Sequence, residues 1–204
     1  MSDIVENPEA YFRQFLPPRD RLLIDLEQEA QREDIPIVGP VVGELLFILA
    51  VATRAGRILE LGAATGYSAI YMARALQSPG GRLVTLENDP AMAARAELNF
   101  QKAGLAGLIT VITADALTQM NAMTDPFDFV FMDIDKEQYA AALPHCHRLL
   151  RPGGLLVADN VGFKEADPFN RMISEAEGWR QVSLFTYLPF HSPEKDGLCL
   201  ALRV

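Results

Sequence analysis

The sequence has few cysteines and no long apolar stretch. Cys146 and Cys199 lie far apart and outside any CxxC spacing, so we expect no disulfide framework and no zinc site, and we expect both thiols to be buried. The longest apolar run, residues 45–52, is much shorter than the roughly 20 residues that a membrane-spanning helix needs. The first residues, MSDIVENPEAYFRQF, lack the basic end and apolar core of a signal peptide. We therefore expect a cytoplasmic protein that does not cross a membrane.

Basic residues are also scarce. The chain has 18 Lys and Arg against 27 Asp and Glu, which gives a formal net charge of -9. Such a charge opposes binding of a polyanion over an extended basic surface and favours small or cationic ligands. The 204 residues, half of them hydrophobic, are enough for one sizeable core but short for two, and they contain no repeat and no Gly/Ser linker. We expect a single domain over residues 1–204.

Short apolar runs alternate with helical patterns along most of the chain. The runs are typical of strands buried on both faces, and they cover residues 57–61, 82–87, 109–113, 127–133 and 155–159. Helical patterns, with apolar residues three and four positions apart, cover residues 66–77, 90–103 and 137–150. This alternation predicts an α/β fold with a doubly wound, mainly parallel sheet.

The two ends of the chain follow other patterns. Residues 20–32 and 41–53 read as two helices that precede the first strand and either cover an edge of the sheet or form a partner surface. Near the other end, runs at 182–188 and 198–204 flank PFHSPEKDG, a connection rich in turn residues. The tail is therefore expected to close the sheet with an antiparallel pair.

A glycine-containing loop, ELGAATGYS, follows the first predicted strand. Gly62 and Gly66 let the backbone pass close to a ligand before a helix begins, although a tight strand-to-helix turn alone would also explain them. The second strand ends in Glu87, at a position where doubly wound folds bind ribose hydroxyls. Because GxGxxG is absent and the loop has no Lys or Arg for a pyrophosphate, S-adenosylmethionine is favoured over NAD or ATP as the ligand.

Polar residues follow the third predicted strand at the same sheet edge. There Asp115 could cap a helix while the backbone around Ala116 meets an adenine, and a plain helix cap explains Asp115 equally well.

A second polar cluster follows two later strands. If those strands are neighbours, Asp133, Asp159 and Asn160 lie at ends roughly 5 Å apart and offer three hard oxygens to one ion. Such ligands favour Mg²⁺, with Mn²⁺ or Ca²⁺ as substitutes, whereas zinc would prefer His or Cys. The alternative is that these residues only cap the following helix and turn. Lys136 can point into the same crevice and accept a proton, although a solvated surface lysine is the commoner role.

Three segments together resemble the metal-dependent class I O-methyltransferases, the family of catechol and caffeoyl-coenzyme A O-methyltransferases and their bacterial relatives. They are ILELGAATGYSAI, FDFVFMDIDKEQY and LLRPGGLLVADNV, in the right order and at compatible spacing. The resemblance implies a Rossmann-like class I methyltransferase fold, with a mainly parallel seven-stranded sheet and a C-terminal antiparallel hairpin. Residues 1–55 would form N-terminal helices, and residues 56–204 the core.

The resemblance also implies an activity and a set of roles. The activity is divalent-metal-dependent transfer of the S-adenosylmethionine methyl group to a hydroxyl of a small catechol-like or phenolic acceptor, by in-line displacement. Lys136 would be the general base, Asp133, Asp159 and Asn160 would bind the metal, and the N-terminal helices would form a homodimer. Val38 would meet the cofactor through its backbone, and Glu60 and Gly62 would line its methionine end. The full cofactor set is Val38, Glu60, Gly62, Ser68, Glu87, Asp115, Ala116 and Asp133.

One departure from the family pattern leaves the acceptor open. Only VGFKEAD separates Asn160 from the next helical stretch, where family members usually have a longer segment, so the acceptor pocket is expected to be more open or completed by a second subunit. Some bacterial relatives methylate 5-hydroxyuridine in transfer RNA, but the acidic chain lacks a basic run there, so nucleic acid is the second choice. A catalytically idle adenosine-binding module would not need Lys136 beside three metal ligands. His191, in the PFHSPEKDG loop, is expected to be solvated.

Overall fold

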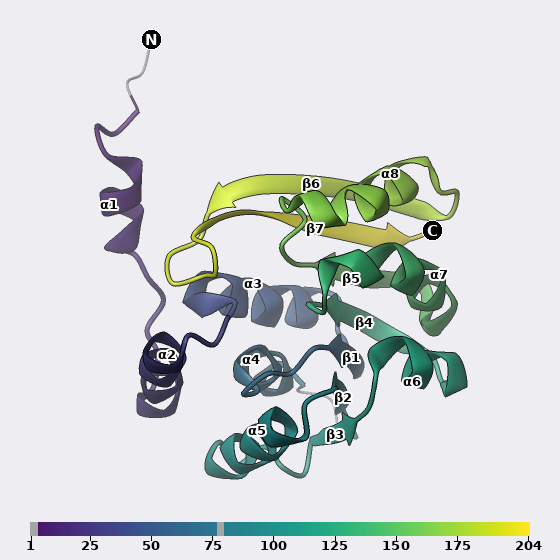
Figure 1. The fold of residues 1–204 in the computed structure, drawn as a ribbon, viewed down its shortest axis with the longest axis horizontal. Helices are drawn as coiled ribbons and strands as arrows, with labels where there is room; N and C mark the ends of the chain where they lie inside the picture. Colours follow the sequence, from purple (N-terminus) through teal and green to yellow (C-terminus); the bar gives the residue numbers. More distant parts are fainter. Residues whose placement is uncertain (1–3, 77–79) are drawn as a thin grey trace.

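Seven strands form one sheet in the computed structural model, which describes residues 4–76 and 80–204 (Figure 1). The strand order is β3-β2-β1-β4-β5-β7-β6. The first five strands are parallel, and β7 runs antiparallel to both β5 and β6. This arrangement confirms the predicted sheet and its closing hairpin. The strands are β1 (Arg57–Leu61), β2 (Arg82–Glu87), β3 (Ile109–Thr113), β4 (Phe127–Met132), β5 (Leu150–Ala158), β6 (Trp179–Tyr187) and β7 (Lys195–Arg203).

Helices cover both faces of this sheet. Figure 1 shows α3, α4 and α5 on one side and α6, α7 and α8 on the other, while α1 stands away from the rest of the molecule. In the described part of the chain, none of the helices is long and apolar enough to cross a membrane. The α-helices are α1 (Pro8–Arg13), α2 (Arg21–Glu33), α3 (Gly39–Ala52), α4 (Tyr67–Arg74), α5 (Pro90–Lys102), α6 (Ala116–Ala122), α7 (Tyr139–Leu149) and α8 (Asp167–Glu175). Two short 3₁₀ helices are η1 (Lys136–Gln138) and η2 (Lys164–Ala166).

The central strand β4 explains why two apolar cores form. Its side chains alternate between the two faces of the sheet. Phe129 and Phe131 pack with α2 to α5, whereas Val130 and Met132 pack with α6, α7 and α8. All four are fully buried, as expected for a parallel strand covered on both sides. Cys146 and Cys199 are buried in the second core, as the sequence predicted.

Several element boundaries differ from the prediction. Strand β5 begins at Leu150 rather than 155, because the segment with Pro152 still follows β4, with a register shift between Phe127 and Phe129. The helix predicted at 137–150 begins with the 3₁₀ turn η1 and ends at Leu149. The helix predicted at 66–77 ends at Arg74, and residue 77 lies outside the described residues. Helix α1 was not predicted, because six residues are too few to show a helical period, whereas α6 begins directly after Asp115, where the sequence suggested a helix cap.

The core of the sheet generates a stability prediction. Leu59 is fully buried at the centre of β1, whereas Leu98 on α5 is 54% exposed. Leu59→Ala is expected to lower the free energy of unfolding by about 2–5 kcal/mol, because it leaves a cavity in the core. Leu98→Ala is expected to change it by less than about 0.5 kcal/mol. Urea denaturation of both variants checks this pair, and equal losses would contradict the assigned core.

Candidate active site

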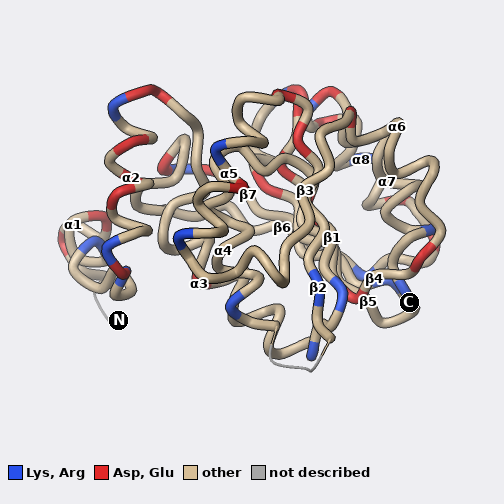
Figure 2. The backbone as a smooth tube through the Cα atoms, turned by 90° about the horizontal axis from the view of Figure 1, so that it is seen from below, with Lys and Arg blue, Asp and Glu red and all other residues tan. Residues whose placement is uncertain are grey.

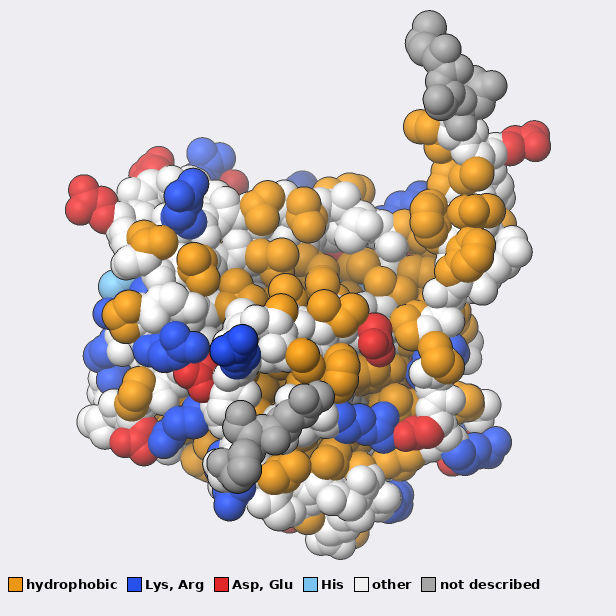
Figure 3. Space-filling view, turned by 180° about the vertical axis from the view of Figure 1, so that it is seen from behind, with side chains coloured by type: hydrophobic (Ala, Val, Ile, Leu, Met, Phe, Trp, Pro, Cys, Tyr) orange, Lys and Arg blue, Asp and Glu red, His pale blue; other side chains and the backbone are white. Residues whose placement is uncertain are grey.

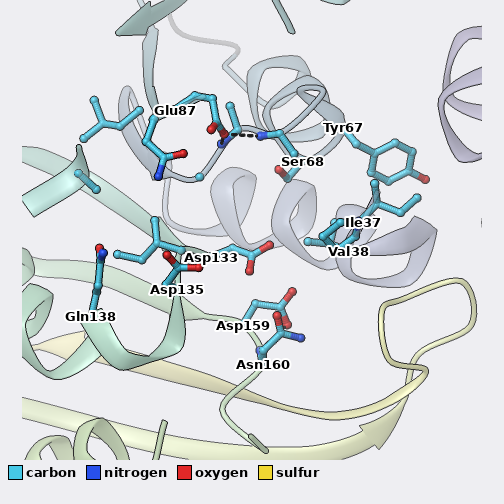
Figure 4. Close-up of a pocket in the computed structure, with 18 of the residues that line it drawn as sticks. Ile37, Val38, Tyr67, Ser68, Glu87, Asp133, Asp135, Gln138, Asp159 and Asn160 are labelled. Atoms are coloured by element: carbon cyan, nitrogen blue, oxygen red, sulfur yellow. Dashed lines mark hydrogen bonds between the residues drawn. The ribbon is translucent and has the colours of Figure 1, made fainter. Parts of the chain in front are cut away.

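The parallel strands end at a cavity of about 240 Å³ (Figure 4). The segments that follow β1, β2, β3, β4 and β5 all contribute to its wall, as expected where neighbouring parallel strands end together. Every candidate site residue from the sequence lines this cavity except Glu60. One crevice therefore holds both the predicted cofactor residues and the predicted metal ligands.

The loop after β1 forms one wall, and its two glycines are required by close packing. Gly62 and Gly66 have φ angles of +92° and +86°, in the left-handed region that side chains disfavour. A side chain at Gly62 would collide with the carbonyl of Asp133, and one at Gly66 would collide with the ring of Phe100. The loop therefore makes the predicted tight turn, and its backbone passes close to the cavity.

Glu87 holds the loop in place while it lines the cavity. Its Oε2 accepts hydrogen bonds from the backbone N–H groups of Ala63 and Ala64, at 3.1 and 2.8 Å, and its Oε1 accepts one from Asp89 N–H at 2.9 Å. A carboxylate offers about four lone-pair sites, so these three bonds leave room for one further donor such as a ribose hydroxyl. The sequence predicted a ligand role for Glu87, and the structure adds a role in ordering the loop.

Glu60 lies behind the loop rather than in the cavity wall. It is fully buried, and it accepts hydrogen bonds of 2.6 Å from the hydroxyls of Ser68 and Thr85. Burial raises the pKa of the Glu60 carboxyl to about 7, against the opposing effect of the two hydroxyl bonds. We expected Glu60 to line the methionine end of the cofactor site, but Glu60 is not among the residues that line the cavity. The Ser68 hydroxyl donates its hydrogen bond to Glu60, so the Ser68 oxygen, on a residue that lines the cavity, remains available as an acceptor.

Asp115 and Val38 complete the cofactor side of the cavity. Asp115 Oδ1 accepts a hydrogen bond of 2.8 Å from Thr118 N–H, so it caps α6, and these bonds lower the pKa of its carboxyl. Both Asp115 and Ala116 also line the cavity, so capping does not exclude ligand contact. Val38 precedes α3 and is buried with little side-chain exposure, which leaves mainly its backbone to face the cavity.

The oxygen-rich cluster lies at the ends of β4 and β5. These strands are parallel neighbours whose last paired residues are Met132 and Ala158, so Asp133 and Asp159 follow side by side. Figure 4 shows their carboxylates pointing toward one another, with Asn160 next to Asp159. The hydroxyl of Tyr139 ties the two strand ends together, because it lies 3.2 Å from the Met132 carbonyl oxygen and 3.0 Å from that of Asp159.

Asn160 is oriented so that its amide oxygen is left for other partners. The residue has a φ of +52°, which Asn tolerates better than most side chains. Its Nδ2 donates to Asp196 Oδ2 at 2.6 Å and to the Ser192 carbonyl at 3.3 Å. Asp196 is buried and was not singled out by the sequence, because it follows Asn160 by 36 residues. Its role is to set which way the Asn160 amide faces.

Lys136 lies beside the cluster. Its Nζ is 3.0 Å from Asp133 Oδ1, and the side chain is about one-fifth exposed. The 3₁₀ turn η1, which begins at Lys136, brings the ammonium back over the end of β4. The predicted proximity of Lys136 to Asp133 is therefore present, and the lysine lines the cavity rather than projecting into solvent.

The residues fit a divalent cation, although no group of three or more His, Cys, Asp or Glu residues that could hold a metal was found in the described part of the chain. The candidate set has only two such residues, and its third member is an amide. Burial raises the pKa of the Asp133 carboxyl, and the charge on Asp159 raises it further. A cation between the two carboxylates would relieve this repulsion, and hard carboxylate and amide oxygens are the ligands that Mg²⁺ and Ca²⁺ accept.

His191 occupies a place that the sequence did not predict. We expected a solvated loop residue, but His191 is only 4% exposed, and its Nε2 lies 2.9 Å from both carboxylate oxygens of Asp159. The 188–194 loop folds back over the end of β5, so the contact joins residues 32 positions apart. No local pattern could have indicated this pairing.

Comparison with known proteins places the chain in a family. A family described as O-methyltransferase matches residues 19–168. Catechol O-methyltransferase of Niastella koreensis is 39% identical over 166 residues, which cover 78% of this chain and 75% of that protein. Catechol O-methyltransferase of Mycobacterium tuberculosis is 42% identical over 120 residues, 58% of this chain and 54% of the relative. The match thus spans only about half of the mycobacterial protein.

Solved structures of O-methyltransferases resemble this fold over nearly the whole chain. An O-methyltransferase from Bacillus cereus in complex with SAH superposes with a TM-score of 0.87 at 30% identity and covers 97% of both chains. The O-methyltransferase TomG from Streptomyces achromogenes, in complex with SAM, gives 0.86 at 32% identity, with 97% of this chain and 96% of that chain covered. With the family match covering more than half of its length, this chain belongs to the O-methyltransferase family and has its Rossmann-like methyltransferase fold.

Proposed function

We propose that this chain transfers the methyl group of S-adenosylmethionine to a hydroxyl of a small catechol-like or phenolic acceptor, with the help of a divalent cation. The observation that carries the proposal is that the loop at Gly62 and Glu87 and the cluster of Asp133, Asp159 and Asn160 line the same cavity. A methyl donor held at the loop would then face an acceptor held at the cluster. The names of the Niastella and Mycobacterium relatives support the acceptor class.

The charge distribution supports a cationic cofactor and a metal ion. Figure 2 shows acidic residues gathered where the strands end, whereas Lys and Arg lie at the opposite end of the sheet and along the helices beside it. Arg57 and Arg82, for example, begin strands β1 and β2, while Glu87 ends β2. S-adenosylmethionine carries a sulfonium charge and no phosphate, so it suits this edge. A transfer RNA acceptor is less well supported, since its phosphates would meet an acidic surface.

The residues of the chain divide the proposed chemistry between positioning and proton transfer. A bound divalent cation would stabilise the developing oxyanion of the acceptor. Asp133, Asp159 and Asn160 would hold that ion at the end of the sheet. Lys136 would accept the hydroxyl proton in its neutral amine form, because its nitrogen already lies on the cavity wall beside Asp133. Alignment of the donor methyl with the acceptor oxygen would supply much of the remaining rate enhancement.

A homodimer is proposed from a continuous apolar surface. Figure 3 shows hydrophobic side chains gathered across one face of the molecule and along the projecting N-terminal arm. Helix α1 buries none of its six residues, all of which the structure describes, and it is held by Arg13, which pairs with Glu194. We propose that a second copy of this chain covers this surface, because large exposed apolar patches are typical of protein–protein interfaces. The exposed hydrophobic residues of α1, α3, β6 and the segment after α1 are Tyr11, Phe12, Phe15, Ile48, Val51, Val182, Leu184 and Phe185.

Asp159→Ala tests the proposed ion site in an activity assay with labelled S-adenosylmethionine, caffeate and Mg²⁺. The methyl-transfer rate is expected to fall by at least about 10–100-fold, the loss that even an outer-shell change causes at metal sites. Cofactor affinity should stay the same, because the loop at Gly62 is unchanged. Asp125→Ala, at a side chain 72% exposed and remote from the cavity, is the matched control. Wild-type activity in Asp159→Ala, or activity that survives EDTA, would contradict the ion site.

Lys136→Met tests the proton acceptor. The value of kcat is expected to fall by about 10²–10⁴-fold, the usual contribution of general acid–base catalysis, while KM for S-adenosylmethionine stays constant. Lys102→Met, on α5 and outside the cavity wall, should retain the wild-type rate. If Lys136→Met keeps the wild-type kcat, the base is another group.

The dimer proposal is checked by light scattering at micromolar concentration. We expect twice the chain mass of 22.5 kDa. Replacing exposed apolar residues by charged ones, as in Leu184→Glu, is expected to shift the population toward monomer, because a charge would then be buried in the interface. A wild-type mass of 22.5 kDa would rule out the dimer under these conditions.

A further inference from the structure

His191 lies between its own loop and the carboxylate of Asp159. Both side chains are about 1% exposed. On one side of the ring, Nδ1 lies 2.6 Å from the Pro193 carbonyl oxygen, and on the other side Nε2 lies 2.9 Å from each oxygen of Asp159. Both partners can only accept hydrogen bonds in this arrangement, so both ring nitrogens donate and the ring is the protonated imidazolium. The ring thus bridges the loop and the end of strand β5.

The loop that presents His191 is held in place without any help from Asp159. Leu188 N–H donates to the Glu194 carbonyl at 2.7 Å, and Ser192 N–H donates to the Ile37 carbonyl at 3.2 Å. Gly39 lets the loop pack closely, because a Cβ at that position would lie only 2.6 Å from the Phe190 carbonyl carbon. These contacts fix the loop to the segment before α3, so the backbone at His191 is held in place.

The hydrogen bonds on Asp159 restrict how it can bind an ion. Oδ1 accepts from Asn160 N–H at 2.8 Å and also faces His191, whereas Oδ2 faces only His191 among these partners. The single Nε2–H is shared between the two oxygens, so with the Asn160 N–H on Oδ1 as well, Oδ2 is the oxygen with more unused acceptor capacity. The carboxylate can rotate little, and its remaining acceptor site is on one defined oxygen.

We propose that His191 is a positioning residue for the ion site, which holds the Asp159 carboxylate so that Oδ2 is presented to a divalent cation. The inference rests on the proposed function, because it requires an ion between Asp133, Asp159 and Asn160. It extends that function by assigning the 188–194 loop to the site. In the same way that Asp196 orients Asn160, His191 orients the other ligand from the end of β5.

Two substitutions of similar polarity distinguish the contact of the ring with Asp159 from its contact with the Pro193 carbonyl. His191→Gln places an amide nitrogen near the position of Nε2, where it can still donate to Asp159. His191→Asn places an amide nitrogen near the position of Nδ1, where it can reach the Pro193 carbonyl but not Asp159. Mn²⁺ binding to the full-length protein, followed by the electron paramagnetic resonance signal of the free ion, measures the effect directly and requires no turnover.

We expect His191→Asn to weaken Mn²⁺ binding by about 10–100-fold, as loss of outer-shell hydrogen bonds does at other metal sites. His191→Gln should restore most of the affinity. S-adenosylmethionine affinity should be equal in all proteins, which shows that the cavity is folded. His147→Asn, at a histidine that packs against Trp179 away from the cavity, should bind Mn²⁺ like the wild type.

The outcomes that overturn the inference differ from those that overturn the proposed function. If both His191 variants bind Mn²⁺ at least as tightly as the wild type, or both bind it equally weakly, the hydrogen bond to Asp159 does not position the ligand, and only this inference fails. A fall in melting temperature without a change in Mn²⁺ affinity would likewise reduce His191 to a packing residue. If the wild type itself binds no Mn²⁺, the ion site of the proposed function fails, and the role of His191 fails with it.

Discussion

Two carboxylates at neighbouring strand ends are the arrangement on which the rest of the site depends. Asp133 and Asp159 directly follow the last register pair of β4 and β5, and their mutual repulsion together with burial raises the pKa of the Asp133 carboxyl. Leaving two such charges together in a region of low polarity is costly unless cations or hydrogen-bond donors compensate them. The surrounding residues can be understood as that compensation.

The compensating groups come from two separate parts of the chain. Lys136, in the turn after β4, contacts Asp133, while His191, in the loop before β7, contacts Asp159. Asp196 takes the amide nitrogen of Asn160 and so turns the amide oxygen away from itself. These contacts leave a few oxygen atoms of Asp133, Asp159 and Asn160 without a donor from the protein. A divalent cation would complete the charge balance that the protein groups begin, and the acceptor hydroxyl would be placed next to it.

Two further buried acids order the loop after β1. Glu87 fixes the loop through the N–H groups of Ala63 and Ala64, and Glu60 accepts a hydrogen bond from the Ser68 hydroxyl. Both acids therefore act partly through the backbone or through another side chain. In the proposed function, the loop would hold the methyl donor and the oxygen cluster the acceptor, and the same parallel sheet positions both segments.

Much of this arrangement could be predicted because it follows from local patterns and from one rule of topology. Apolar runs gave the five parallel strands, and the rule that such strands end together brought Asp133 and Asp159 into one crevice. Glu60 is less clear from the sequence, because its fully buried carboxylate accepts hydrogen bonds from Ser68 and Thr85, and only the folded chain brings Thr85 beside it.

The remaining features depend on contacts between distant segments. The pairing of His191 with Asp159 and that of Asp196 with Asn160 join residues 32 and 36 positions apart. They require the 188–194 loop to fold back over β5, which neither composition nor period indicates. The short helix α1 was not predicted for a different reason, since fewer than two full turns give no periodic signal.

The most direct test of the account is calorimetric titration of a catechol such as caffeate into the cofactor-loaded wild-type protein, with Mg²⁺ and with EDTA. If the carboxylate pair holds an ion that in turn holds the acceptor, heat of catechol binding should appear with Mg²⁺ and disappear with EDTA. Catechol binding of equal affinity in both conditions would contradict the central role assigned to the two carboxylates.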